Sequence, residues 1–123
     1  MSDIDFEDMT MRVVAKGNRE AKAVFDERSK LLIKSLIGKR ASGSLFGLKP
    51  RGIQTALAEL SEATGIRFSC HSFRRAFASN LRRKGLDISH IMLLGNWQDL
   101  SMPLRYSQSV TFEDSMELYR KLI

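Results

Sequence analysis

Tyr106 is the residue of this sequence that raises a chemical question. It lies in GNWQDLSMPLRYSQS, residues 95–109, directly after an arginine, in a chain that has only two tyrosines. A phenol hydroxyl attacks well only after it loses its proton, and the reference pKa of tyrosine is about 10. Taken alone, such a tyrosine is more often a packed ring than a nucleophile. The interpretation therefore depends on which other residues the fold brings to Tyr106.

His71 and Arg74 are a second candidate pair, spaced i, i+3 in the segment HSFRR. That spacing places both side chains on the same face of a helix. Imidazole can move a proton near neutral pH, and guanidinium can offer paired N–H donors to phosphate oxygens. Each residue alone is also common in ordinary helices. His71 and Arg74 therefore indicate a catalytic site only together with the other candidate residues.

Basic residues concentrate in residues 67–84, RFSCHSFRRAFASNLRRK, a segment without any acidic residue. The chain carries a net charge of +6, yet its first eight residues hold four acids and no base. This asymmetry favours a polyanionic partner, because lysines and arginines that neutralise phosphates release condensed counterions. A solvated helix face is the alternative that charge alone leaves open. The candidate nucleic-acid contacts are Arg67, Arg75, Arg82, Arg83 and Lys84.

The bulk composition is that of a globular protein of one domain, residues 1–123. Hydrophobic residues make up 43% of the chain, and no apolar run has the length of a membrane span. The single cysteine, Cys70, cannot form an intramolecular disulfide and suits a reducing compartment, and we expect it to be a small buried residue. No group of residues has metal-ligand spacing. We expect a cytoplasmic protein without metal, cofactor, membrane or small-molecule substrate.

The elements that must position these residues can be predicted from pattern and caps. Residues 9–25 alternate as a β-hairpin, with Gly17-Asn18 as the turn and Lys16 at the end of the first strand. Thr111 and Asp114 form a capping-box pattern before the last helix. The class is therefore α+β, predominantly α-helical, with a small antiparallel β-hairpin or sheet near the N-terminus. Helices are expected over residues 26–38, 50–65, 71–85, 87–95, 104–110 and 111–123.

Taken together, these features resemble the catalytic domain of tyrosine recombinases, the phage integrase family. HSFRR, the LLGNW turn with Trp97, and Tyr106 nine residues later follow that family's order. The hairpin VVAKGNREAKAV resembles the family's β-hairpin, whose catalytic lysine precedes a Gly-Asn turn. The resemblance covers residues 3–107, and its strength lies in four motifs in one order, since each is weak alone.

The resemblance implies cleavage and rejoining of double-stranded DNA in site-specific recombination or integration. Tyr106 would attack a phosphodiester and form a 3′-phosphotyrosyl intermediate, which stores the bond energy without metal or ATP. Arg74 would hold the non-bridging oxygens as negative charge develops on them. His71 would act as a proton shuttle or phosphate ligand.

Two further residues receive roles from the same resemblance. Lys16 would protonate the departing 5′ oxygen, with Lys22 of the same hairpin as the alternative. Trp97 would donate its indole N–H to a phosphate oxygen and pack against the helix that carries the nucleophile.

One part of the family pattern does not occur in residues 1–123. A second arginine, on a helix of the TGLR-x-SEL kind, precedes the strand that DIDFEDM resembles, and this sequence starts just short of it. Removing one preorganised donor to a developing oxyanion costs about 10²–10³ in rate. We therefore expect an N-terminally incomplete catalytic domain that has weak or no recombinase activity alone. Within the cytoplasm, we expect the protein to be associated with the nucleoid.

Two other classes of function remain open from the sequence. The chain could be a non-catalytic DNA-binding remnant or regulator, or a helical protein-interaction module. The apolar face of helix 111–123 bears on assembly, because the family docks such a segment onto a neighbouring protomer. The resemblance implies a homo-tetramer on DNA, and packing of this helix onto its own domain is the alternative.

Overall fold

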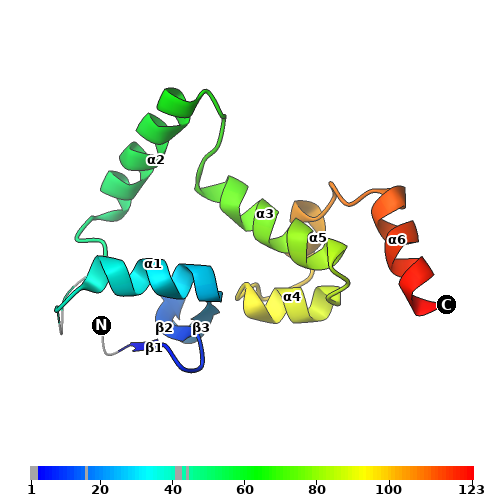
Figure 1. Cartoon of the computed structure of the whole chain (residues 1–123), viewed down its shortest axis with the longest axis horizontal. Coiled ribbons are helices and arrows are strands. Elements are labelled where there is room, and N and C mark those ends of the chain that lie inside the picture. The colour runs from blue at the N-terminus through cyan, green and yellow to red at the C-terminus, as the bar shows by residue number, and fades with distance from the viewer. Residues whose placement is uncertain (1–2, 16, 41–42, 44) are drawn as a thin grey trace. The chain divides into compact units, whose positions relative to one another are not determined.

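The computed structural model describes residues 3–15, 17–40, 43 and 45–123. The chain divides into two compact units, Met1–Ile53 and Gln54–Ile123. Over the described residues the elements are a three-stranded antiparallel sheet followed by six helices (Figure 1). The predicted class, α+β and predominantly helical with a small sheet near the N-terminus, is confirmed.

The first unit begins with the sheet, in the order β1 (Ile4–Asp5), β2 (Thr10–Ala15) and β3 (Arg19–Val24). β2 and β3 form the predicted antiparallel hairpin, in which Thr10 pairs with Val24 and Ala15 with Arg19. Gly17 and Asn18 both have positive φ, 82° and 60°, the backbone region that glycine and asparagine tolerate best. The Gly-Asn pair is therefore what lets the chain reverse here.

Helix α1 (Glu27–Ile37) follows β3 and is defined at both ends by local residues. The Asp26 carboxylate accepts a hydrogen bond from the Ser29 backbone N–H at 2.8 Å, and Gly38 ends the helix with φ 58°. Lys34 of α1 lies 5.2 Å from the ring centroid of Phe6, which also packs edge-on against Phe25. This aromatic pair joins α1 to the segments flanking the sheet.

Helix α2 (Pro50–Thr64) spans the division between the units. Proline suits the first position of a helix, where no N–H partner is needed. Gly65, with φ 72°, follows the last residue of α2. The beginning and end of this helix lie where the sequence predicts them.

The second unit packs α3 (Cys70–Arg83) against three shorter helices. These are α4 (Ile88–Leu94), α5 (Ser101–Tyr106) and α6 (Phe112–Leu122). Ala78 of α3, Ile91 of α4 and Pro103 of α5 are fully buried. Cys70, which we expected to be buried, is exposed. It opens α3, whose buried residues lie two turns further along the helix.

Helix α5 differs from the expected segment 104–110, because it begins three residues earlier and ends at Tyr106. The Asp99 carboxylate accepts a hydrogen bond from the Ser101 backbone N–H at 2.8 Å and so favours an earlier start. Pro103 lies in the first turn, where a missing N–H removes no helical hydrogen bond. Tyr106 is therefore the last residue of a short helix.

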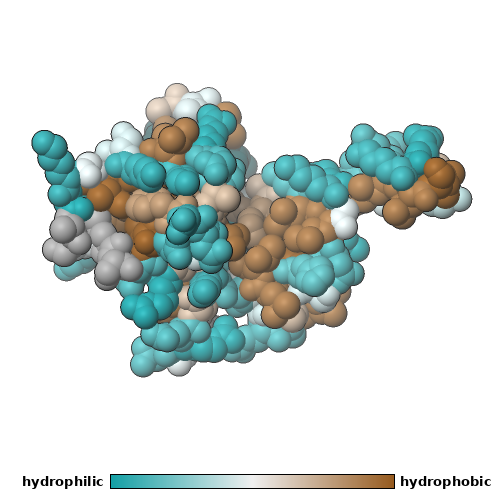
Figure 2. All heavy atoms as spheres, turned by 60° about the horizontal axis from the view of Figure 1, so that its bottom comes forward, coloured by the Kyte–Doolittle hydropathy of each residue, from teal (hydrophilic) through white to brown (hydrophobic). Residues whose placement is uncertain are grey.

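Helix α6 begins with the capping box that the sequence predicts. The Thr111 hydroxyl accepts from the Asp114 N–H at 3.1 Å, and the Asp114 carboxylate accepts from the Thr111 N–H at 2.8 Å. Phe112, Tyr119 and Leu122 are exposed, and Figure 2 shows their helix, at the right-hand end, with an apolar side and a polar side. Among the described residues, no helix combines the length and the apolarity needed to cross a bilayer.

Candidate active site

The Tyr106 hydroxyl lies 3.4 Å from Nδ1 of His71. His71 lies in the first turn of α3 and Tyr106 at the end of α5, and α3 packs most closely against α5 among its neighbours. Which of the two groups donates depends on the tautomer of the imidazole. The helix packing thus brings a potential nucleophile next to a group that can take its proton.

Trp97 joins Tyr106 to Arg74. Its ring centroid lies 5.8 Å from that of Tyr106, and the Arg74 guanidinium carbon lies 5.9 Å from the indole centroid. Phe77 packs on the indole with a centroid distance of 6.4 Å. A guanidinium over an aromatic face keeps its N–H donors in a defined plane. His71, Arg74, Trp97 and Tyr106 therefore form one cluster in the second unit.

The turn after α4 fixes the indole in this cluster. Asn96 has φ 61°, in the left-handed region, and the Trp97 N–H donates to the Met92 carbonyl at 3.0 Å. The indole folds back over Gly95, where an added Cβ would lie 2.1 Å from Cζ3 of Trp97. Gly95 itself has φ −85°, so this glycine provides space rather than an unusual backbone angle. The sequence did not indicate this packing.

A pocket of about 490 Å³ adjoins the nucleophile candidate and is rich in basic residues. Arg105 is exposed here, and sequence reasoning did not single it out, although its position directly before Tyr106 was a usable signal. A phosphodiester beside Tyr106 would meet the guanidinium groups of Arg75 and Arg105 in this pocket. The pocket is lined by His71, Arg75, Met102, Arg105, Tyr106 and Gln108.

The residues predicted to contact DNA fall into two structural groups. Arg67, Arg75 and Lys84 are exposed. Arg82 instead donates from Nη1 to the Ser107 hydroxyl at 2.9 Å, and Arg83 donates from Nε to the Asp114 carboxylate at 3.2 Å. These two arginines are engaged within the protein, and their contact with DNA stays a prediction.

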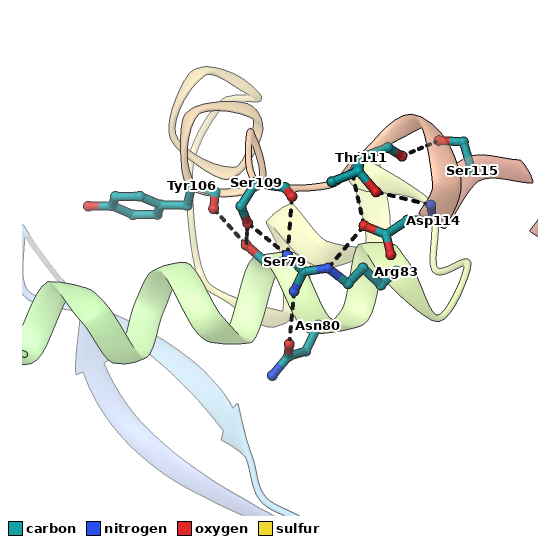
Figure 3. A network of polar contacts seen from close by, with 8 residues as sticks. All are labelled: Ser79, Asn80, Arg83, Tyr106, Ser109, Thr111, Asp114 and Ser115. Atoms are coloured by element: carbon teal, nitrogen blue, oxygen red, sulfur yellow. Dashed lines mark hydrogen bonds and ion pairs between the residues drawn. The ribbon is translucent and has the colours of Figure 1, made fainter. Parts of the chain in front are cut away.

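The backbone of Tyr106 is held by α3. The Ser79 hydroxyl donates to the Tyr106 carbonyl oxygen at 2.9 Å, within the network drawn in Figure 3. At the far end of that network, hydrogen bonds from Thr111 hold the pKa of Asp114 below its ordinary value, with a smaller contribution from Arg83. The carboxylate is thereby kept in its charged form.

The predicted general acid cannot be placed at this cluster. Lys16 lies outside the described residues. Lys22, the alternative, belongs to β3 and pairs with Arg12 across the hairpin of the first unit. In the part of the chain that the structure describes, no three His, Cys, Asp or Glu side chains gather as a metal site would require.

The chain matches the Phage integrase family over residues 1–111. It therefore belongs to this family, and its fold is that of the tyrosine recombinase catalytic domain. Tyrosine recombinase XerA of Saccharolobus solfataricus is 31% identical over 112 residues, which cover 89% of this chain and 38% of that protein. The chain thus spans well under half the length of this relative.

Solved structures agree on the fold. The crystal structure of XerA recombinase matches with a TM-score of 0.76 and 18% identity, over 98% of this chain and 49% of that one. The Tn1549 transposon integrase in complex with transposon right end DNA matches with a TM-score of 0.65 and 13% identity, over 98% of this chain and 51% of that one.

Proposed function

We propose that this chain carries the nucleophile of a tyrosine-type DNA recombinase, which cleaves and rejoins DNA strands in site-specific recombination through a 3′-phosphotyrosyl intermediate. The observation that carries the proposal is the 3.4 Å approach of the Tyr106 hydroxyl to Nδ1 of His71. Family membership supplies the reaction class. An isolated tyrosine would not support it, but a tyrosine beside a proton acceptor, with a guanidinium in the same cluster, does.

The reaction can be written in terms of these residues. The Tyr106 oxygen forms a bond to phosphorus, and the bond from phosphorus to the 5′ oxygen breaks. The phenol proton passes to His71, and the 5′ oxygen takes a proton from a general acid, the role proposed for Lys16. Rejoining is the same step in reverse, with the 5′ hydroxyl as the nucleophile.

Arg74 is proposed to stabilise the pentavalent transition state. Its guanidinium can donate two parallel hydrogen bonds to the non-bridging oxygens, which an ammonium group cannot do with the same geometry. The Trp97 ring contacts both Arg74 and Tyr106, and its indole N–H is a further donor. The cluster thus contains a nucleophile, a proton acceptor and electrostatic donors.

The partner proposed for this site is double-stranded DNA in the nucleoid of the cytoplasm. Exposed basic residues around the pocket and on α3 would neutralise phosphates, and the apolar side of α6 would join protomers in a DNA-bound homo-tetramer. The resemblance also implies a second arginine at the phosphate, and no GLR pattern occurs in residues 1–123. We therefore expect residues 1–123 alone to react about 10²–10³ times more slowly than a protein that supplies it.

Covalent capture tests the proposal. Nicked duplexes with a randomised sequence would be incubated with residues 1–123 and with the longest protein that the source reading frame encodes. Protein–DNA adducts that resist denaturing electrophoresis would be digested and mapped by mass spectrometry. We expect a phosphotyrosyl peptide that contains Tyr106.

Tyr106→Phe should abolish the adduct, and Tyr119→Phe is the matched control because Tyr119 is the only other tyrosine. An adduct that persists in Tyr106→Phe overturns the nucleophile assignment. Salt-dependent DNA binding without any adduct in either protein would instead identify a DNA-binding protein that does not cleave.

A further inference from the structure

We infer that Ser79 is a positioning residue for Tyr106, held in place by a directional series of hydrogen bonds that starts at Arg83. This inference rests on the proposed function of Tyr106. We call Arg83, Ser109 and Ser79 the serine relay. It lies entirely in the second unit and links α3 to the segment that follows the nucleophile.

Each hydroxyl of the serine relay accepts one hydrogen bond and donates one. Nη2 of Arg83 donates to the Ser109 hydroxyl at 3.0 Å, and the Ser109 hydroxyl donates to that of Ser79 at 3.1 Å. The Ser79 hydroxyl donates to the Tyr106 carbonyl oxygen at 2.9 Å. Because every donor points the same way, the positive charge of Arg83 polarises the whole series toward the Tyr106 carbonyl.

The position of Tyr106 in its helix explains why this contact matters. Tyr106 ends α5, and the last carbonyls of a helix have no partner within the helix. Ser79 supplies that partner from α3 and is itself only 4% exposed, so water cannot easily replace it. Figure 3 shows the Tyr106 ring pointing away from the network while its carbonyl oxygen faces Ser79.

The next residue of this segment is fixed in a similar way. The Ser107 hydroxyl donates to the Pro103 carbonyl at 2.7 Å and accepts from Nη1 of Arg82 at 2.9 Å. Ser107 is 1% exposed. Two adjacent arginines of α3 therefore hold the segment around Tyr106, Arg82 directly through Ser107 and Arg83 through Ser109.

Arg83 also connects the serine relay to α6. Its Nε donates to the Asp114 carboxylate at 3.2 Å, and its Nη1 donates to the Asn80 side-chain oxygen at 3.3 Å. Asp114 belongs to the capping box of α6. Every nitrogen of the guanidinium thus has a partner, so its orientation is set by groups on both sides of the relay.

Ser79→Ala is the decisive variant. It deletes one oxygen and favours the helical backbone of α3, because alanine has the higher helix propensity, so the protein should still fold. It leaves the Tyr106 carbonyl without its donor. Ser115→Ala is the matched control, since the Ser115 hydroxyl donates only to the Thr111 carbonyl of its own helix turn.

The first readout needs no DNA. Trp97 is the only tryptophan, and its ring contacts that of Tyr106 at 5.8 Å, so its fluorescence reports on the position of the nucleophile. We expect Ser79→Ala to change the emission of the folded protein and increase its quenching by acrylamide, while Ser115→Ala leaves both unchanged. Circular dichroism and urea unfolding would confirm that each variant is folded under the conditions of the assay.

The second readout is the single-turnover rate of adduct formation, in the longest protein that the source reading frame encodes. A misplacement of about 1 Å costs on the order of 10²-fold, so we expect Ser79→Ala to slow the step about 10- to 100-fold at unchanged DNA affinity. Ser109→Ala should slow it less, and Ser109→Thr should restore the rate because it keeps the hydroxyl at an exposed position.

The outcomes separate this inference from the proposed function. If Ser79→Ala leaves the rate and the fluorescence unchanged while Tyr106→Phe abolishes the adduct, the positioning role is wrong and the function stands. A lower unfolding midpoint with an unchanged rate would show that Ser79 only stabilises the fold. If the wild-type protein forms no adduct, the proposed function fails, and the fluorescence of Ser79→Ala alone decides whether Ser79 positions Tyr106.

Discussion

The hydroxyl of Tyr106 and Nδ1 of His71 lie 3.4 Å apart although 35 residues separate them in the sequence. The contact joins the end of a six-residue helix to the first turn of a fourteen-residue one. Neither helix positions the pair alone. Trp97, from the turn between α4 and α5, packs on the Tyr106 ring and completes the arrangement.

The first prediction concerns His71 as the proton acceptor. His71→Ala should slow adduct formation by about 10²- to 10⁴-fold, the usual contribution of general acid–base catalysis, with little change in DNA affinity. His90→Ala is the matched control, because His90 is the only other histidine and is exposed on α4. Single-turnover rates on nicked duplexes measure both. Equal rates for the two variants would remove His71 from the proposed mechanism.

Gly95 provides a second prediction through steric packing. A methyl group there would lie 2.1 Å from Cζ3 of Trp97, so Gly95→Ala must displace the indole. Overpacking of this kind lowers the free energy of unfolding by about 1–3 kcal/mol. The displaced indole would also lose its contacts with Tyr106 and Arg74. Urea unfolding and Trp97 fluorescence should both change.

Gly52→Ala is the control for that substitution. Gly52 lies inside α2, where the added methyl would meet Leu48 at an ordinary 3.5 Å. Alanine at such a helical position stabilises by about 0.4–1 kcal/mol. If Gly95→Ala is equally harmless, the indole does not occupy the position described.

Local signals explain why most of the fold could be predicted from the sequence. Asp26 and Gly38 define α1, and the pair of Thr111 and Asp114 begins α6, through contacts within a few residues of chain. The expected start of α5 at residue 104 was wrong, because the helix begins at Ser101 and includes Pro103. A first-turn proline costs no helical hydrogen bond, and Asp99 stabilises the earlier start.

The candidate site was less predictable, because its geometry comes from distant partners. A run of arginines in α3 has the same appearance in sequence whether the side chains face solvent or protein. Arg82 and Arg83 turn toward Ser107 and Ser109, whose positions depend on how α5 packs on α3. The place of Gly95 under the indole likewise appears only when the turn is folded.

Arg105 carries a third prediction, on DNA affinity. It is exposed in the pocket beside Tyr106, and we expect it to neutralise a phosphate. Arg105→Gln should weaken binding to a duplex of any sequence and reduce the slope of log affinity against log salt by about 0.9 per lost contact. Arg120→Gln, which removes the same charge from the last turn of α6, should leave the slope unchanged. Equal slopes for both variants would contradict a phosphate contact by Arg105.

The last prediction concerns the pH dependence of stability at Asp114. Hydrogen bonds from Thr111 lower the pKa of this carboxyl from its ordinary value of 3.8, and the contact with Arg83 adds to the effect. A carboxyl whose pKa is lowered in the folded state stabilises the protein fully above pH 3.8. The contribution is lost as the pH falls from 3.8 through the lower folded value, because over that range the unfolded state binds a proton more readily than the folded state.

Asp114→Asn should therefore lose less unfolding free energy than the wild type when the pH is lowered from neutral to about 2, as measured by urea unfolding. Arg83→Gln should keep most of the wild-type acid sensitivity, because the largest cause of the shift is the Thr111 backbone N–H rather than the guanidinium. If Asp114→Asn is as acid-sensitive as the wild type, the capping box does not hold this carboxylate in its charged form. If Arg83→Gln instead behaves like Asp114→Asn, the ion pair and not the backbone hydrogen bond controls the charge at the start of α6.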